Sequence, residues 1–297
     1  MSKSTAFATA VAKAVPIGFV CGPDMTGRCS NLHGVAAHGI RLDAAERVVG
    51  TSAGSLIASA LVGGHVRRLH TELAELAHVP ALLSAMAPAG HLHPSQQRAL
   101  DLFRQAGDGA VATVRAIGHA ALAAQTPRPE AMRRSVSLVA GRGHFPSDSL
   151  CVTCVDCYTG ERCVITRGTS TPIPFAVAAS SAVPGLFAPQ PIGDRRCMDG
   201  GVSGTGIHLD LVAGATRVVV LALSDGSQLA PGTMTTSPGS QQRELDELAA
   251  SGARVFVRVP EAATLDELMS PTAVPKAMAM GARQADADAH ELASFRN

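Results

Sequence analysis

The sequence predicts a layered α/β protein in which helices cover both faces of an apolar sheet, and three observations support this. Short apolar segments alternate with runs of helical periodicity along most of the chain. Arg217 to Leu223 is a run of apolar residues after its first position, with three successive β-branched valines, which is typical of a buried parallel strand. A G-x-S-x-G motif, Gly50-Thr51-Ser52-Ala53-Gly54, stands between a short strand and a helix. Strands and helices that alternate in this way form layered α/β folds.

The first quarter of the chain predicts two strands and two helices. Residues 15–21 read as the first buried strand. The loop Gly22-Pro23-Asp24-Met25-Thr26-Gly27 follows, and its glycine spacing can present backbone N–H groups to an anion. A helix is expected from about Ser30 to His38. Arg47 to Val49 forms the second strand, and Ser55 to Val62 the helix after the G-x-S-x-G motif.

The pattern changes to helices over residues 65–140. Apolar residues recur at helical spacing from Val66 to Leu76, and further helices are expected over 94–104 and 110–124. We expect a helical insertion, not a separate domain. Its apolar faces would pack on the sheet or, alternatively, line a pocket for an acyl chain.

The second half of the chain returns to alternating elements, and we expect a single domain over residues 1–297. The expected elements are a hairpin (150–155 and 162–166), a helix (174–182), a strand pair turning at Gly193-Asp194, a short helix (207–213), the strand 217–223, a flexible loop (224–240), a helix (241–250), a strand (255–259) and a final helix (272–294).

The composition of the chain excludes some classes of protein to which it could belong. The chain has 297 residues, of which 46% are hydrophobic, so it can bury a large core. Its formal net charge is +1 and its basic residues occur as scattered pairs, so we expect no nucleic-acid partner. None of the three lysines stands in an S-x-x-K motif, which disfavours a Ser-Lys hydrolase.

We expect a cytoplasmic location. Seven cysteines, an odd number, suit free thiols in a reducing compartment. No run of 18 apolar residues predicts a transmembrane helix. The small residues from Ser4 to Ala12 faintly resemble a signal peptide, but the expected core strand 15–21 follows at once.

We expect no metal and no other cofactor. Cys151, Cys154 and Cys157 have C-x2-C-x2-C spacing, but side chains alternate along a strand, so Cys154 would point away from the other two. His91-x-His93 lies in a Gly/Pro-rich loop without a third ligand.

Ser52 is the candidate nucleophile, because the motif describes a nucleophile elbow whose glycines allow a turn that exposes the serine Oγ. A serine needs a positioned base. A triad of Ser52, Asp199 and either His208 or His290 would have the chain order of α/β-hydrolases. Alternatively Asp199 is itself the base. A free aspartate has a pKa near 3.9, so the site would have to desolvate it or orient it directly onto the serine.

Three stretches together resemble one family. They are Gly50-Thr51-Ser52-Ala53-Gly54, the stretch from Ala176 to Phe187, and Met198-Asp199-Gly200-Gly201. Their order and spacing are similar to those of patatin-like phospholipases, over about residues 15–223. The resemblance implies a three-layer α/β/α sandwich with a mainly parallel sheet. It also implies a Ser-Asp dyad that hydrolyses acyl esters of lipids without histidine or metal, with Ser52 as nucleophile and Asp199 as base. The motif glycines carried over are Gly27, Gly50, Gly54, Gly200 and Gly201.

The departure from the family pattern lies in the oxyanion loop. The family has G-G-G-x-x-G where this chain has Gly22-Pro23-Asp24-Met25-Thr26-Gly27. Proline has no N–H, and a carboxylate opposes a developing oxyanion. Losing one oxyanion donor typically costs about 3 to 4 kcal/mol. The backbone candidates for the oxyanion hole are Gly22, Asp24, Met25 and Ala53.

The sequence therefore predicts a serine-dependent lipid acyl hydrolase of the phospholipase A or carboxylesterase type. The expected partner is an acyl-ester lipid or another small acyl substrate, with transient contact to a membrane surface. Two alternatives remain: an acyltransferase or thioesterase with the same dyad, or a catalytically impaired patatin-like scaffold that binds a lipid or a protein.

Overall fold

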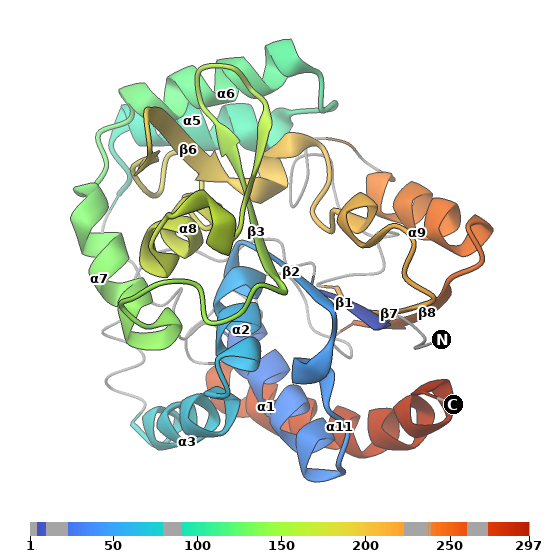
Figure 1. Ribbon diagram of the computed structural model, residues 1–297. Helices are drawn as coiled ribbons and strands as arrows, with labels where there is room; N and C mark the ends of the chain where they lie inside the picture. The colour runs from blue at the N-terminus through green and yellow to red at the C-terminus, as the bar shows by residue number, and fades with distance from the viewer. Residues whose placement is uncertain are drawn as a thin grey trace.

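A computed structural model describes residues 5–9, 23–79, 91–222, 237, 239–259 and 273–296. Eight strands within these residues form one sheet, in the order β5-β6-β3-β2-β1-β7-β8, with β4 paired to β3 (Figure 1). The strands are β1 (Thr5–Thr9), β2 (Arg47–Thr51), β3 (Leu150–Asp156), β4 (Arg162–Ile165), β5 (Gln190–Ile192), β6 (Arg195–Asp199), β7 (Arg217–Leu221) and β8 (Arg254–Arg258).

The sheet is parallel from β3 through β2, β1 and β7 to β8, and antiparallel where β4, β5 and β6 join. The mainly parallel α/β fold is thus confirmed. The strand between β2 and β7 is β1. It lies in the stretch of small residues from Ser4 to Ala12, where no strand was predicted from the sequence. The expected strand over 15–21 lies outside the described residues.

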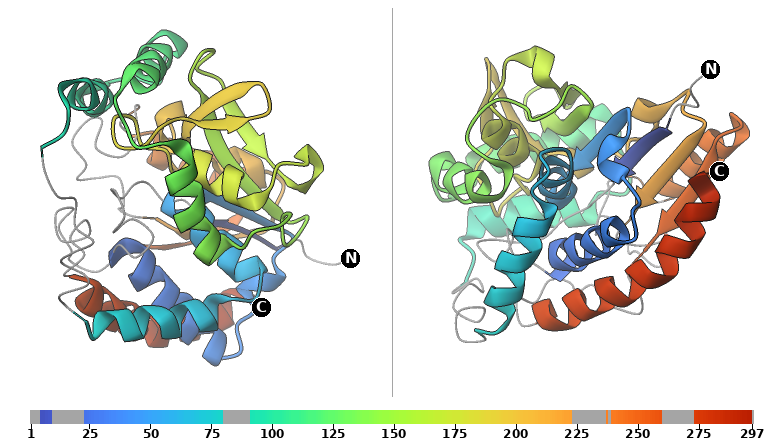
Figure 2. Two further views of the ribbon diagram at one scale, coloured as in Figure 1. Left: turned by 90° about the vertical axis from the view of Figure 1, so that its left-hand side faces the viewer. Right: turned by 60° about the horizontal axis from the view of Figure 1, so that its bottom comes forward.

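Helices cover both faces of the sheet. Alternate residues of β7 enter different clusters, with Val219 in the larger core and Val218 in the core beneath α9 (Ser240–Ala250) and the 3-10 helix η5 (Leu209–Val212). The larger core is covered by α1 (Pro23–Ala37), α2 (Ala53–Val62), α3 (Val66–Ala77), α7 (Pro129–Ala140), α8 (Ile173–Ser180) and α11 (Val274–Arg296). Figure 2 shows α11 lying along α1 at the edge of this layer.

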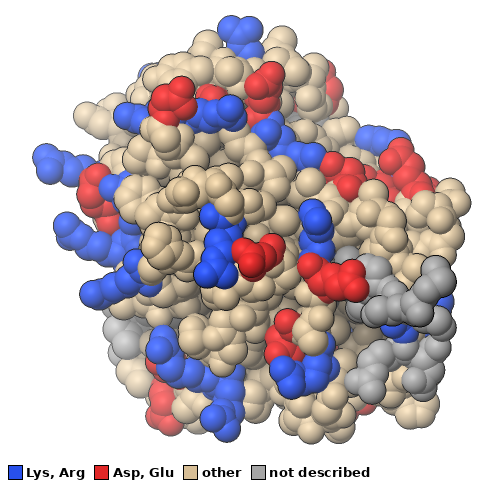
Figure 3. Space-filling view, viewed as in Figure 1, with Lys and Arg blue, Asp and Glu red and all other residues tan. Residues whose placement is uncertain are grey.

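The three helices named within 65–140 are confirmed as α3, α5 (Pro94–Gln105) and α6 (Val111–Ala123), and α7 is a further helix in this region. α5 and α6 pack with β3 and β6 in a third core cluster that includes Phe103, Ile117 and Met198. The part of the chain that the structure describes contains no helix that could span a membrane. On the face shown in Figure 3, acidic side chains are scattered among the basic ones.

Most of the expected 224–240 loop lies outside the described residues, which include only 237, 239 and 240 of it.

Candidate active site

Ser52 occupies the turn between β2 and α2. Its backbone has φ 53° and ψ −131°, a conformation that costs a residue with a side chain on the order of 1–3 kcal/mol. Gly50 makes the turn sterically feasible, because a Cβ at that position would lie 2.6 Å from the Ser55 Cα. The G-x-S-x-G motif therefore forms the strand, sharp turn and helix that a nucleophile elbow requires.

Asp199 faces this serine from the other side of the site. The Ser52 Oγ donates a hydrogen bond to the Asp199 Oδ2 at 2.8 Å, across 147 residues of sequence. Both side chains are 0% exposed. The fold thus brings together the two residues that the sequence singled out, in direct hydrogen-bond contact.

The end of β6 fixes the direction of the carboxylate. The Asp199 backbone N–H donates to the Ala182 carbonyl at 3.0 Å, and the Asp199 Oδ1 accepts from the Gly201 N–H at 2.9 Å. Gly200 is needed for close approach, because a Cβ there would lie 2.6 Å from the Thr153 carbonyl oxygen. With Oδ1 held by Gly201, Oδ2 points at the serine.

Two further contacts around Ser52 were not predicted from the sequence. The Ser52 N–H donates to the Ser180 Oγ at 2.8 Å, and the hydroxyls of Thr51 and Thr153 lie 2.7 Å apart. Ser180 belongs to the Ala176–Phe187 stretch that resembles the family. Its place in this stretch was the sequence feature that could have pointed to Ser180. Its contact with Ser52 spans 128 residues, so spacing alone could not reveal it.

Neither candidate histidine takes the position of a base on Ser52. His290 is exposed on α11. His208 is fully buried, and the Arg162 Nη1 lies 3.2 Å from its Nδ1. Burial, and then the charge of Arg162, lower the pKa of His208 to about 3. An imidazole with so low a pKa is a poor proton acceptor at neutral pH.

The expected oxyanion loop has a different structure. Pro23 through Gly27 are the first residues of α1, so the prediction of a loop over 23–27 with a helix starting near Ser30 is wrong, and Gly22 lies outside the described residues. Proline favours the first helical position because its missing N–H has no partner there anyway. Asp24 and Met25 are in the first turn of α1, and Ala53 is the first residue of α2. Amides at these positions have no intrahelical acceptor.

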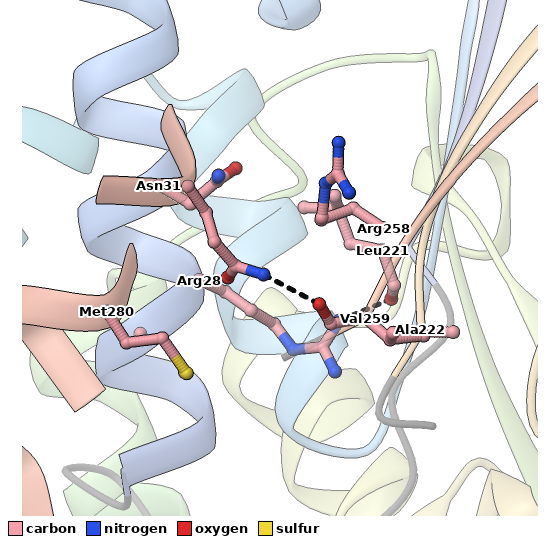
Figure 4. A pocket seen from close by; sticks show the side chains of 9 residues that line it. Arg28, Asn31, Leu221, Ala222, Arg258, Val259 and Met280 are labelled. Atoms are coloured by element: carbon pink, nitrogen blue, oxygen red, sulfur yellow. Dashed lines mark hydrogen bonds between the residues drawn. The ribbon is translucent and has the colours of Figure 1, made fainter. Parts of the chain in front are cut away.

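Gly27 has a packing role. A Cβ there would lie 3.2 Å from the Ala277 carbonyl oxygen, so Gly27 lets α11 approach α1. Arg28 follows and lines a cavity of about 20 Å³ between α1, α11 and the ends of β7 and β8 (Figure 4). In it Arg28 donates to the Leu221 carbonyl, and Gln284 donates to the Val259 carbonyl at 2.8 Å. A cavity of this size holds about one water and no acyl chain.

The two motifs considered for metal binding do not converge. Cys151, Cys154 and Cys157 fall in three different core clusters, in keeping with alternation along β3. His93 caps α5, since its Nδ1 accepts from the Ser95 N–H at 3.2 Å. A different trio meets instead: Cys154, Cys163 and Cys197, with their Sγ atoms within 4.8 Å of one another. Finding it required the register of β3 with β4 and β6.

Comparison with known proteins places this site in context. A sequence model described as patatin-like phospholipase matches residues 14–211. None of the curated proteins compared with the chain matches it. Among solved structures, VipD from Legionella pneumophila is 12% identical with a TM-score of 0.42, over 76% of this chain and 51% of VipD. The type III effector protein ExoU is 14% identical with a TM-score of 0.35, over 96% of this chain and 53% of ExoU. The chain thus spans about half the length of these two proteins.

Proposed function

Because the chain belongs to the patatin-like phospholipase family, we propose that it is a lipid acyl hydrolase that uses Ser52 and Asp199 as a catalytic dyad. The observation that carries the proposal is the 2.8 Å hydrogen bond from the Ser52 Oγ to the Asp199 Oδ2. The substrate class is a phospholipid or another fatty-acyl ester, in line with the family. The hydrolase is of the phospholipase A or carboxylesterase type.

The proposed chemistry has two steps. The Ser52 Oγ attacks the ester carbonyl and its proton passes to Asp199, which then protonates the departing alcohol. Water next attacks the acyl-enzyme, gives a proton to Asp199 and releases the fatty acid, and Ser52 regains its proton. The Ala53 N–H, at the positive end of the α2 dipole, is the proposed oxyanion donor, with Asp24 and Met25 as further candidates.

Asp199 can act as a base without histidine because the site meets two requirements. The Asp199 residue is 0% exposed, and its Oδ2 is already aligned with the serine proton that it would accept. The Ser52 Oγ is equally buried, so catalysis requires the residues that cover the dyad to move when a lipid enters.

Covalent labelling tests the nucleophile. A fluorophosphonate probe, added with phospholipid vesicles, is expected to modify wild-type protein at Ser52, with the site located by peptide mass spectrometry. Ser52→Ala should abolish labelling, whereas the control Ser59→Ala, a buried serine of α2 whose hydroxyl donates to the Ser55 carbonyl and not to Ser52, should retain it. A folded wild-type protein that stays unlabelled would refute the proposal.

A second candidate is a scaffold of the same family that binds lipid without turnover. It is favoured by Pro23, which removes one N–H from the first turn of α1, and by the complete burial of Ser52. Fatty-acid release from vesicles by the wild type, lost in Ser52→Ala, would exclude this candidate. Vesicle binding without release in either protein would support it.

A further inference from the structure

Three cysteines from three strands converge on the face of the sheet that α8 covers. Cys154 lies on β3, Cys163 on β4 and Cys197 on β6, and their Sγ atoms are all within 4.8 Å of one another. Cys154 and Cys197 are fully buried, whereas Cys163 is 8% exposed. Cys154 is the direct cross-strand partner of Cys163 on one side and of Asp199 on the other. The register therefore forces the three thiols together.

An arginine distinguishes this trio from cysteines that only fill space in a core. The Arg195 Nη1 donates to the Cys163 Sγ at 2.9 Å. Cys29 provides the contrast, because its thiol donates to the Val66 carbonyl at 3.7 Å, whereas the Cys163 sulfur accepts from a guanidinium.

The donor set selects a soft ion of low coordination number. Thiolates prefer Cu(I), zinc and iron–sulfur clusters over hard cations. A metal–thiolate bond of about 2.3 Å puts the sulfurs of a trigonal site roughly 4 Å apart, so the cluster needs little movement to close on an ion. Among the described residues, no histidine or carboxylate joins the three sulfurs in the group. Structural zinc is almost always four-coordinate, so the set fits a three-coordinate ion better.

We propose that Cys154, Cys163 and Cys197 form a three-thiolate site for one soft metal ion of the Cu(I) type, with Arg195 offsetting part of its negative charge. All three cysteines are buried, and Cys163, which is 8% exposed, is the least completely buried of them. Binding releases the protons that the thiols still hold, and no electron is transferred. The site lies on the strand that carries Asp199, since Cys197 precedes Asp199 by two residues on β6.

Competition for Cu(I) under anaerobic, reducing conditions tests the site. The reduced full-length protein is titrated against the Cu(I) complex of bathocuproine disulfonate, whose absorbance reports the copper that the protein removes. Wild-type protein is expected to take up one Cu(I) per chain. Cys163→Ser should weaken this uptake by roughly tenfold or more, because one of three ligands is lost. The matched controls Cys29→Ser and Cys151→Ser replace buried cysteines outside the trio and should bind as the wild type does.

If Cys163→Ser does not fold, X-ray absorption of the copper-loaded wild type provides a second test, because it reports the atoms that coordinate the copper. Three sulfur neighbours and no oxygen or nitrogen neighbour are expected. The proposal is overturned if the wild type removes no copper from the chelator, or if Cys29→Ser loses as much uptake as Cys163→Ser. It is also overturned if stoichiometric Zn(II) displaces the bound copper.

Discussion

At the scale of single residues, Ser52 is restrained from two directions. Its N–H is held by Ser180 and its Oγ by Asp199, at 2.8 Å in each case. These contacts offset the cost of the backbone conformation at φ 53°, which a serine rarely adopts on its own. The nucleophile is thus oriented before substrate binds, which is what efficient attack requires.

Ser180→Ala tests this restraint. The substitution leaves the buried Ser52 N–H without its acceptor, which costs about 1–3 kcal/mol of unfolding free energy. We also expect slower hydrolysis, because Ser52 loses a contact that orients it. Chemical denaturation and initial rates of fatty-acid release measure the two effects.

Ser181→Ala is the matched control for Ser180→Ala. The Ser181 Oγ is buried without a hydrogen-bond partner in the part of the chain that the structure describes, so removing it should not destabilise the protein. Equal losses in both variants would show that the contact between Ser180 and Ser52 has no special role.

The sequence predicted residues that belong to local motifs and missed those that act across the fold. Ser52 and Asp199 were found because each stands in a short glycine pattern. Ser180 and the trio of Cys154, Cys163 and Cys197 depend on contacts between distant segments, and these exist only once the strand register is known.

At the scale of secondary-structure elements, the main error concerned the start of α1. Glycine and proline at positions 22–27 read as a loop, yet Pro23 is the first residue of the helix and Gly27 is a contact with α11. The same residue types serve in turns, at helix starts and at close helix contacts, so local sequence could not distinguish these uses.

The 3-10 helix η5 has a buried histidine at its start, and this predicts a pH dependence of stability. Burial, then Arg162, lower the pKa of His208 from 6.5 to about 3. Between these values the unfolded chain binds a proton that the folded protein does not. Stability therefore rises with pH in this window and falls as the pH drops below about 6.5. The expected loss from pH 7 to pH 5 is about 2 kcal/mol.

His208→Asn should flatten this dependence when urea unfolding is measured at pH 5, 6 and 7. Asparagine does not titrate and tolerates the backbone of His208, which has φ 50°. The control His290→Asn replaces an exposed histidine on α11 and should keep the wild-type slope. If the unfolding free energy of His208→Asn changed with pH as steeply as that of the wild type, His208 would not be the source of the pH dependence.

At the scale of the whole molecule, α11 packs along α1. It thereby joins the C-terminal part of the described chain to the helical layer that covers the larger core. Glycines make this contact close. A Cβ at Gly281 would lie 2.0 Å from the Gly27 carbonyl oxygen, and a Cβ at Gly34 would lie 2.5 Å from the Ala285 Cβ. Because the Gly281 clash is with backbone, a side chain there must push the two helices apart.

Gly281→Ala is expected to lower the unfolding free energy by about 1–3 kcal/mol, as overpacking does elsewhere. Thermal unfolding measures the effect. Gly143→Ala is the control, since a Cβ at Gly143 meets nothing within 4 Å. A Gly281→Ala protein as stable as Gly143→Ala would show that α11 does not need this close packing.

The layered fold was predictable because periodicity distinguishes strands from helices, and the continuous apolar run in β7 indicated a buried parallel strand. The order of the strands was not predictable. The placement of β6 beside β3, which delivers Asp199 to Ser52, depends on long-range pairing that no local pattern reports. The assignment of residues 1–297 to a single domain stays a prediction.

The central claim, that Asp199 is the base for Ser52, is tested most directly by Asp199→Asn. Asparagine keeps the size of the side chain but cannot accept the serine proton. Fatty-acid release from phospholipid vesicles should fall by roughly 10²–10⁴-fold, the usual contribution of a general base. The thermal unfolding temperature should stay close to that of the wild type. Hydrolysis by folded Asp199→Asn at the wild-type rate would contradict the dyad.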